Sequence, residues 1–444
     1  MNTLEKLRSG ELAGCTRLNL SCGLREFPRE IFSLADTLEI LDLSGNALSS
    51  LPEDLSRLHK LRILFCSNNR FTELPAVLGQ CMRLDMVGFK ANRISSVPVA
   101  ALPPALRWLI LTDNRIEELP AELGQCTQLQ KLMLAGNRLQ SLPHTLAACT
   151  KLELLRIPAN RLAELPDWLF ELPRLAWLAY AGNPFCEAHE TAALTHIANA
   201  GIGWGELQLQ HKLGEGASGV IHRAIWQHSS GRHGVAVKLF KGAVTSDGLP
   251  RSEMAACICA GGHPNLIAVH GKVVDHPADE DGLVMSLVRD GFRSLAGPPS
   301  LVSCTRDIYA DDVTFSMNTV IRIALGIASA ARHLHERGIM HGDLYAHNIL
   351  YSRDGDALLG DFGAASFCAQ EDRRRAEALQ RLEVRAFACL LGELLERCDA
   401  EIDSSEKFSM LMELQAQCAR DDGRARPLFA EIERELLRLE WCAM

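Results

Sequence analysis

Three glycines in the second half of the chain stand at a spacing that suits phosphate binding. They are Gly214, Gly216 and Gly219 in the segment LGEGASGVIHRA. Such spacing also opens dinucleotide-binding folds, but there the glycines lead into a helix. Here a β-branched stretch follows, and then VAVK, which ends at Lys238. The pattern predicts two strands around a glycine-rich turn, whose main-chain N–H groups cover phosphates while Lys238 neutralises them.

Further chemistry-bearing residues lie downstream. Asp343 and Asn348 stand in IMHGDLYAHNIL, and Asp361 stands in LLGDFG. Carboxylate and amide oxygens are hard ligands of the kind that magnesium takes together with substrate phosphates. With Lys238 and with Glu253, which lies shortly before HPNL, these residues follow one another in an order that resembles the protein-kinase family over roughly residues 205–435.

The resemblance to protein kinases implies a role for each residue. Asp343 would be the catalytic aspartate that accepts or orients the proton of the attacking hydroxyl, and Glu253 would hold the catalytic Lys238. Asn348 and Asp361 would bind Mg²⁺. The ATP-binding set would comprise Gly214, Gly216, Gly219, Lys238, Met285 as gatekeeper, Ser286 and Val288 of the hinge, and Leu350.

Two departures from the kinase pattern bear on activity. Gly342 stands where the family usually has an arginine that pairs with a phosphate on the activation loop. We therefore expect activity that does not depend on phosphorylation of that loop. Tyr345 stands where Ser/Thr kinases usually carry a lysine, and only a protonated His347 offers a replacement for this cation.

A third departure is the short activation segment between Asp361 and Glu383, which contains no APE-like tripeptide. Arg426 would therefore lose its usual glutamate partner, and Glu377 or Glu383 is the substitute that the sequence offers. The charged segment QEDRRRAEALQRLE is predicted to be a surface helix.

Three classes of function stay open. The intact DFG, the VAVK strand and HPNL favour an ATP-dependent protein kinase, most simply one that acts on Ser or Thr. HGDL with a short activation segment also resembles small-molecule kinases of the aminoglycoside and choline type. The third class is a catalytically weak or inactive kinase-like scaffold. Retention of all five polar residues argues against the scaffold.

The first two-fifths of the chain is a repeat, mostly 23 residues long, that reads LxxLxLxxNxLxxLPxxLxxLxx. This pattern resembles the leucine-rich repeat family over seven units and a degenerate first one. Such a unit buries its leucines only against neighbouring units, which predicts a solenoid. We expect the repeated Asn to hydrogen-bond the main chain of adjacent turns, and Cys81, Cys126 and Cys149 to replace core leucines.

The strand positions that alternate with the core leucines form outward columns that are unusually apolar. Such a surface is typical of an interaction site, so we expect it to bind a protein or peptide, with docking on the chain's own second half as the rival. The residues of this surface are Ile63, Phe65, Met86, Trp108, Ile110, Met133 and Trp177.

Length and composition limit the remaining possibilities. The chain has 444 residues and a net charge of -9, which argues against a nucleic-acid partner. No stretch is apolar enough for a signal peptide or a membrane span, and the 15 scattered cysteines suit free thiols in the cytoplasm. We predict an α/β leucine-rich repeat solenoid and an α+β two-lobed protein-kinase-like domain. The boundaries are 1–186 for the repeats, 187–204 for a capping helix and hinge, 205–288 for the N-lobe and 289–444 for the C-lobe.

Overall fold

The chain divides into two units, Met1–Leu172 and Pro173–Met444. The structure is a computed structural model, and it describes residues 3–197, 201–216, 218–229, 231–242, 244–399 and 405–441.

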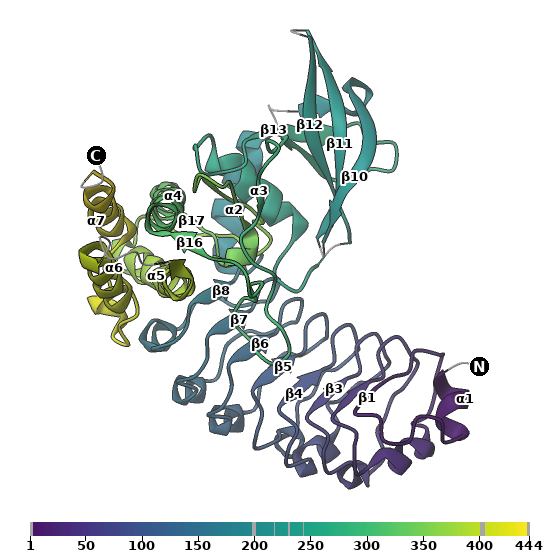
Figure 1. Ribbon diagram of the computed structural model, residues 1–444. Helices are drawn as coiled ribbons and strands as arrows, with labels where there is room; N and C mark the ends of the chain where they lie inside the picture. Colours follow the sequence, from purple (N-terminus) through teal and green to yellow (C-terminus); the bar gives the residue numbers. More distant parts are fainter. Residues whose placement is uncertain are drawn as a thin grey trace. The chain divides into compact units, whose positions relative to one another are not determined.

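The first unit begins with helix α1 (Thr3–Arg8) and continues as a row of short strands, one in each repeat (Figure 1). Each strand pairs in parallel with the strand of the next repeat, so that Leu41 lies beside Leu64 and Leu64 beside Val87. These central residues are buried, as the alternation of a strand requires. The strands are β1 (Arg17–Asn19), β2 (Ile40–Asp42), β3 (Ile63–Phe65), β4 (Met86–Gly88), β5 (Trp108–Ile110), β6 (Lys131–Met133) and β7 (Leu154–Arg156).

The repeated asparagines join successive repeats. In Asn114, Nδ2 donates to the main-chain oxygens of Phe89 at 2.9 Å and Leu111 at 3.0 Å, while Oδ1 accepts from the main-chain N–H of Ile94 at 2.9 Å. One buried amide therefore satisfies main-chain groups that no water reaches. The expected role of the asparagine ladder is confirmed.

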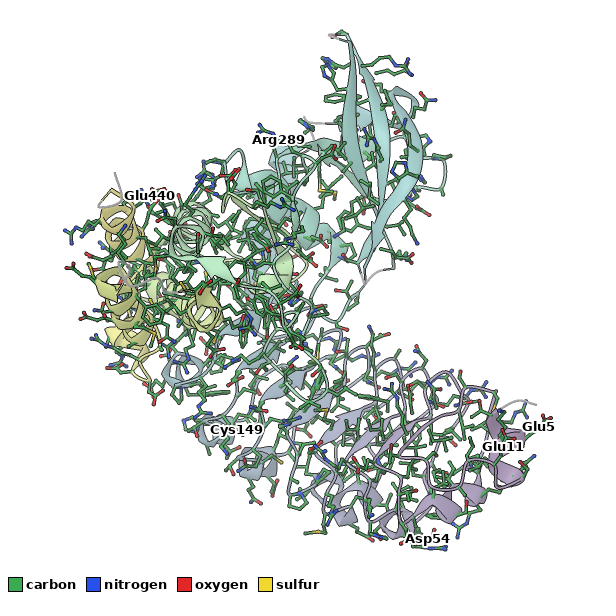
Figure 2. The ribbon with its side chains drawn as sticks, in the orientation of Figure 1. Glu5, Glu11, Asp54, Cys149, Arg289 and Glu440 are labelled. Atoms are coloured by element: carbon green, nitrogen blue, oxygen red, sulfur yellow. The ribbon has the colours of Figure 1, made fainter. Side chains whose placement is uncertain are left out.

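A 3-10 turn follows the strand in most repeats. The repeat proline usually stands immediately before the turn, where its fixed φ suits an extended residue. Cys81, Cys126 and Cys149 end three of these turns and are buried, which confirms that they replace core leucines (Figure 2 labels Cys149). The turns are η1 (Arg29–Leu34), η2 (Leu55–Arg57), η3 (Ala76–Gln80), η4 (Val99–Ala101), η5 (Ala121–Gln125), η6 (His144–Ala148) and η7 (Asp167–Glu171).

The apolar columns are less exposed than the sequence predicted. The prediction is wrong for Ile63, Met86 and Trp177, which are buried. Ile63 and Met86 stand side by side in the register of β3 and β4, where neighbouring side chains of the column cover each other. Trp177 belongs to the second unit and is covered by Tyr345. The other members are half-buried: Phe65, Trp108, Ile110 and Met133.

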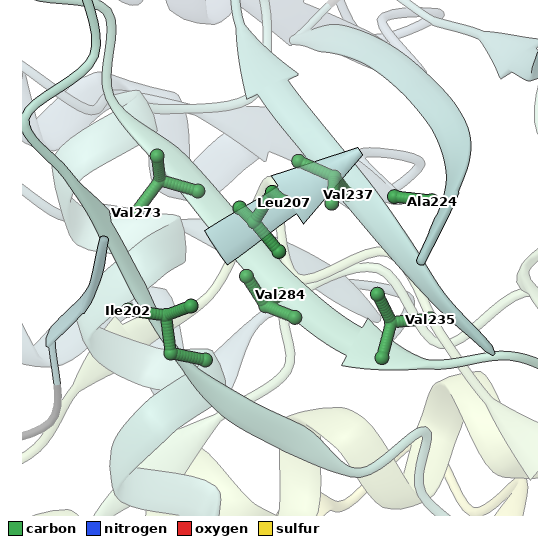
Figure 3. Packing of buried hydrophobic residues seen from close by; sticks show 7 residues of the cluster. All are labelled: Ile202, Leu207, Ala224, Val235, Val237, Val273 and Val284. Carbon is green, nitrogen blue, oxygen red and sulfur yellow. The ribbon is translucent and has the colours of Figure 1, made fainter. Parts of the chain in front are cut away.

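The second unit starts with strand β8 (Trp177–Ala179), turn η8 (Pro184–Cys186) and helix α2 (Glu187–Ile197). Its main sheet has the order β10-β11-β12-β14-β13-β9, and aliphatic side chains fill the core of this sheet (Figure 3). The strands are β9 (Gly201–Gly203), β10 (Leu207–Glu215), β11 (Gly219–His228), β12 (Gly231–Phe240), β13 (Val269–Val274) and β14 (Gly282–Ser286), with turn η9 (Trp204–Glu206) after β9.

Residues 201–203 differ from the expected hinge. They form β9, which pairs in parallel with β13 and buries Ile202 in the core of the sheet. Pairing with β13 supplies the hydrogen bonds that the backbone of this glycine-containing segment needs. Helix α2 was expected as a cap, and it packs on α3 (Pro250–Ala260).

Helices form most of the rest of the second unit. The long helices begin at side-chain caps: Ser316 accepts from the N–H of Thr319 before α4, and Asp372 from that of Arg375 before α5. Helix α5 confirms the expected charged helix. The elements are β15 (Arg293–Ser294), β16 (Phe315–Ser316), α4 (Met317–Glu336), β17 (Ile339–Met340), η10 (Ala346–Asn348), β18 (Ile349–Tyr351), β19 (Ala357–Leu359), β20 (Ser366–Phe367), α5 (Arg373–Glu396), β21 (Cys398–Asp399), α6 (Ser405–Cys418), η12 (Gly423–Ala425) and α7 (Phe429–Trp441).

No helix in the part of the chain that the structure describes is long and apolar enough to cross a membrane.

Candidate active site

Lys238 and Glu253 form a buried ion pair between the sheet and helix α3. Lys238 lies near the end of β12, and its Nζ atom contacts Oε1 of Glu253. Met254 packs with Phe240 and Leu283, which anchors α3 on the sheet and places Glu253 opposite the lysine. Burial disfavours the charge of Lys238, but the nearby carboxylates of Glu253 and Asp361 outweigh this effect and raise its pKa.

The glycine-rich turn joins β10 and β11, as the sequence predicted. The N–H of Gly216 donates to the oxygen of Gly219 at 2.9 Å, which closes the turn. A Cβ atom on Gly219 would lie 2.4 Å from the main-chain oxygen of Leu239, so this position requires glycine. Gly214 and Gly216 instead border open space, where a ligand could approach the backbone.

Asp343 and Asn348 are held together in the loop that joins β17 to β18. Nδ2 of Asn348 donates to Oδ2 of Asp343 at 2.8 Å and to its main-chain oxygen at 2.9 Å. His341 is buried and accepts from the N–H of Asp343, while its other ring nitrogen contacts the oxygen of Gly360 at 2.9 Å. His341 therefore orders the loop through its contacts with the main chain.

Asp361 follows β19 in a left-handed conformation, with φ of 51°. Its Oδ1 atom accepts from the N–H of Gly363 at 3.1 Å, which closes a tight turn. Left-handed φ is uncommon outside glycine and marks positions that the surroundings hold against strain. The carboxylate is close enough to Lys238 to raise the pKa of that amine.

A cavity of about 200 Å³ brings half of the predicted site residues together. From the predicted set, its lining includes Gly216, Gly219, Lys238, Glu253, Met285 and Asp361. The remaining residues of that set do not belong to this lining: Gly214, Ser286, Val288, Asp343, Asn348 and Leu350. Ser286 ends β14, where its N–H donates to the oxygen of Ala268, and Leu350 lies in β18, paired with β15 and β19.

Family models match both halves of the chain. Residues 207–404 match the model for the protein tyrosine and serine/threonine kinases, and residues 36–79 and 104–162 match two models of leucine-rich repeats. The chain carries a leucine-rich repeat region followed by a protein kinase domain.

Individual relatives agree with the kinase domain. A probable serine/threonine-protein kinase, gdt4 of Dictyostelium discoideum, is 34% identical over 167 residues, which cover 36% of this chain and 9% of that protein. The serine/threonine-protein kinase PITSLRE of Drosophila melanogaster is 28% identical over 188 residues, 42% of this chain and 19% of that protein. The chain thus spans less than a fifth of the length of these two curated relatives. The solved structure of a leucine-rich repeat protein of Leptospira interrogans is 30% identical to this chain, with a TM-score of 0.33. The matched part makes up 38% of this chain and 49% of that protein chain.

The surroundings of Gly342 explain why this chain has glycine where protein kinases usually have arginine. This residue has φ of 73°, and a Cβ atom there would lie 2.5 Å from the oxygen of Ala364 and 2.9 Å from that of Leu178. Strand β8 thus occupies the space that a side chain at residue 342 would need. The N–H of Gly342 donates to the carboxylate of Glu383, which also contacts Nε2 of His335 at 2.6 Å.

The predicted partners of Arg426 are wrong. Its guanidinium donates to three main-chain oxygens, those of Pro173 at 2.7 Å, Arg420 at 2.8 Å and Arg381 at 3.0 Å. Glu383 is engaged elsewhere, and Glu377 pairs with arginines of its own helix. Burial lowers the pKa of Arg426 to about 10.

Two partners of the loop that joins β17 to β18 were not predicted from the sequence. Asp307 accepts from the main-chain N–H of His347 at 2.9 Å and contacts its Nδ1 atom at 2.7 Å. Trp177 stacks on Tyr345. Nothing in the sequence near Asp307 marks it, whereas the apolar columns did single out Trp177, although for a different role.

Proposed function

We propose that the kinase domain transfers the γ-phosphate of ATP to a Ser or Thr hydroxyl of a protein. The observation that carries this proposal is the buried ion pair of Lys238 and Glu253 beside Asp361. Burying two charges costs solvation free energy, so such a pair in a cleft favours a binding role over a purely stabilising one. The two curated relatives are named as serine/threonine-protein kinases, which supports Ser or Thr as the acceptor.

In the proposed reaction, Lys238 binds the phosphates under the glycine-rich turn. The acceptor oxygen attacks the γ-phosphorus, the bond from that phosphorus to the bridging β–γ oxygen breaks, and ADP leaves. The hydroxyl proton passes to Asp343, whose carboxylate is held by Asn348. Positioning and charge neutralisation account for most of the catalysis in this class of reaction.

The donor atoms of the site suit the Mg²⁺ that kinases use. Nδ2 of Asn348 donates to Asp343. The amide oxygen, Oδ1, therefore points away from Asp343 and would be the atom that binds the metal. Oδ1 of Asp361 accepts from Gly363, so Oδ2 is the oxygen for a ligand bond. Two hard oxygens with phosphate oxygens and water match the preference of magnesium, which when bound would neutralise phosphate charge.

For the repeat region we propose binding of a protein partner at the four half-buried apolar residues Phe65, Trp108, Ile110 and Met133. The indole of Trp108 is held by Lys131, whose Nζ lies 4.4 Å from the ring centroid, and by a contact from Nε1 to Sδ of Met133 at 3.4 Å. A rigid aromatic residue at the centre of an apolar patch is typical of an interaction hot spot.

The test is incubation of the full chain with labelled ATP and magnesium, followed by mapping of phosphorylated residues on the chain itself and on added proteins. Lys238→Met and Asp343→Asn should each abolish transfer, while the circular dichroism spectrum recorded without denaturant stays that of a folded protein. Label on small alcohols or aminoglycosides alone would support a small-molecule kinase instead. Absence of both transfer and Mg-ATP binding would support a scaffold.

A matched pair tests the repeat surface. Trp108→Glu should weaken partner capture, whereas Met82→Glu, at a position 68% exposed, should leave capture unchanged. Equal capture by the two variants would refute the proposed surface.

A further inference from the structure

Trp177 contacts Leu344 and Tyr345, the two residues that follow Asp343. They lie in the loop that joins β17 to β18, which is the catalytic loop of the proposed function. The indole of Trp177 stacks on Tyr345 with the ring centroids 4.1 Å apart and the planes 4° apart. Its Nε1–H donates to the main-chain oxygen of Leu344 at 3.1 Å. Trp177 as a residue is 1% exposed, and the guanidinium of Arg306 lies 5.4 Å from the centroid of its ring. One side chain of β8 thus supplies both the apolar cover and the polar partner of this segment.

The residues just after Trp177 hold the other side of the site. The main-chain N–H groups of Tyr180 and Ala181 donate to Oγ of Ser366 at 3.0 and 3.1 Å. Ser366 lies in β20, shortly after Gly363, and β20 pairs with β17 immediately before the catalytic loop. Segment 177–181 therefore contacts the chain on both sides of the Asp361 turn.

Strand β8 supplies two contacts that the residues after Asp343 need. A buried carbonyl such as that of Leu344 needs a donor, and an aromatic ring such as Tyr345 needs apolar cover. Between Gly363 and α5 the chain forms only the short strand β20, and it is β8 that supplies both contacts. The close approach of Leu178 to Gly342 shows how tightly β8 fits against this loop.

We propose that Trp177 is a positioning residue of the kinase reaction, acting on Asp343 through Leu344 and Tyr345. This inference rests on the function proposed above. It makes the last leucine-rich repeat part of the catalytic unit, although the repeat pattern assigns it to the solenoid. The contacts of Trp177 with Leu344, Tyr345 and Arg306 lie beside Asp343, so Trp177 should act on turnover and not on nucleotide affinity.

The experiment compares Trp177→Ala and Trp177→Phe in the full chain. Misplacement of a catalytic group by about 1 Å costs about 100-fold in rate, so Trp177→Ala should lower kcat by about 10- to 100-fold. Trp177→Phe keeps an aromatic ring over Tyr345 but loses the N–H donor, so its kcat should lie between that of the wild type and that of Trp177→Ala. The affinity for Mg-ATP, measured by calorimetry, should stay unchanged in both variants.

Trp168→Ala is the matched control, because it removes another buried tryptophan from the preceding repeat. It should leave kcat unchanged. Equal losses of kcat in Trp168→Ala and Trp177→Ala would overturn the proposal, as would an unchanged kcat in a folded Trp177→Ala. If Trp177→Ala does not fold, a wild-type kcat in Trp177→Phe overturns it.

Hydrogen exchange separates this inference from the proposed function. Main-chain amides of residues 343–348 should exchange faster in Trp177→Ala than in the wild type, while those of β11 and β12 should not change. If the wild type transfers no phosphate, the function fails, but faster exchange confined to this loop would still support the positioning role. Unchanged exchange in the loop would refute it.

Discussion

The side-chain amide of Asn348 donates to both the carboxylate and the main-chain oxygen of Asp343, at 2.8 and 2.9 Å. Two hydrogen bonds from one amide fix the rotamer of the aspartate and the direction of the amide oxygen together. Asp343, which is proposed to take the proton, and Asn348, which is proposed to bind the metal, therefore hold each other in position.

Asn348→Ala should lower kcat by about 100-fold, because it frees Asp343 and removes one oxygen ligand. It should also raise the magnesium concentration at which the rate is half-maximal, which titration of activity with MgCl₂ measures. Asn265→Ala is the control. That amide donates to the oxygen of Ala357 at 2.9 Å, so its loss should reduce stability without changing the magnesium requirement.

Removal of Lys238 alone should destabilise the protein as well as inactivate it. Lys238→Met leaves the buried Glu253 without its counter-ion, and breaking a buried pair in this way costs about 3–5 kcal/mol. Lys238→Met with Glu253→Leu should recover most of the free energy of unfolding, measured by urea denaturation, and remain inactive. A double variant no more stable than the single one would contradict the prediction.

Much of the architecture could be predicted from the sequence. The first half carries a regular repeat, and the second half carries motifs at characteristic spacings. The repeat fixes which residue faces the core, as Leu41 and Leu64 show by lying in register and fully buried. The kinase residues were predictable because their order and spacing resemble those of the protein-kinase family. Lys238 and Glu253 do meet, and Asp343 and Asn348 do bond.

The errors concern contacts between segments that lie far apart in the sequence. Trp177 fits the repeat pattern, and nothing in that pattern says that Tyr345 covers it. Arg426 was assigned a carboxylate partner, but burial next to a turn and to Pro173 offered main-chain oxygens instead. Asp307 reaches His347 through a loop of irregular structure, which has no periodicity to read.

Gly342→Ala should impair both stability and transfer. A left-handed residue with a Cβ costs about 1–2 kcal/mol, and the contacts with the oxygens of Ala364 and Leu178 add to this. Gly291→Ala is the matched control, since Gly291 also has positive φ but borders open space. Thermal unfolding should therefore shift clearly further in Gly342→Ala. Equal shifts would show that strand β8 does not constrain this position.

Asn114→Ala should destabilise the repeat region by about 1–3 kcal/mol for each buried main-chain group that it leaves unsatisfied. Urea denaturation followed through the repeats measures this loss. Asn19→Ala provides the control, because Asn19 is exposed and its one side-chain hydrogen bond, to Asp42, is 3.4 Å long. A loss for Asn114→Ala no larger than that for Asn19→Ala would contradict the role of the asparagine ladder.

His347 should make stability depend on pH. Burial disfavours its imidazolium, but the hydrogen bond and charge of Asp307, with the carboxylates of Asp343 and Asp361, outweigh burial and raise the pKa of His347. A pKa above its unfolded value means that the folded state binds the proton more tightly. The contribution is therefore complete below the ordinary histidine pKa of about 6.5, and it is lost as pH rises through the folded value.

The prediction is tested with His347→Gln, which should remove this part of the pH dependence. The free energy of unfolding of the wild type should fall relative to that of the variant as pH rises from about 6.5. If the protonated ring also substitutes for the cation absent at Tyr345, kcat should decline over the same range in the wild type. In that case His347→Lys, which carries a permanent charge, should be less sensitive to pH than the wild type. Parallel stability curves for the wild type and His347→Gln would show that Asp307 does not hold a proton on this ring.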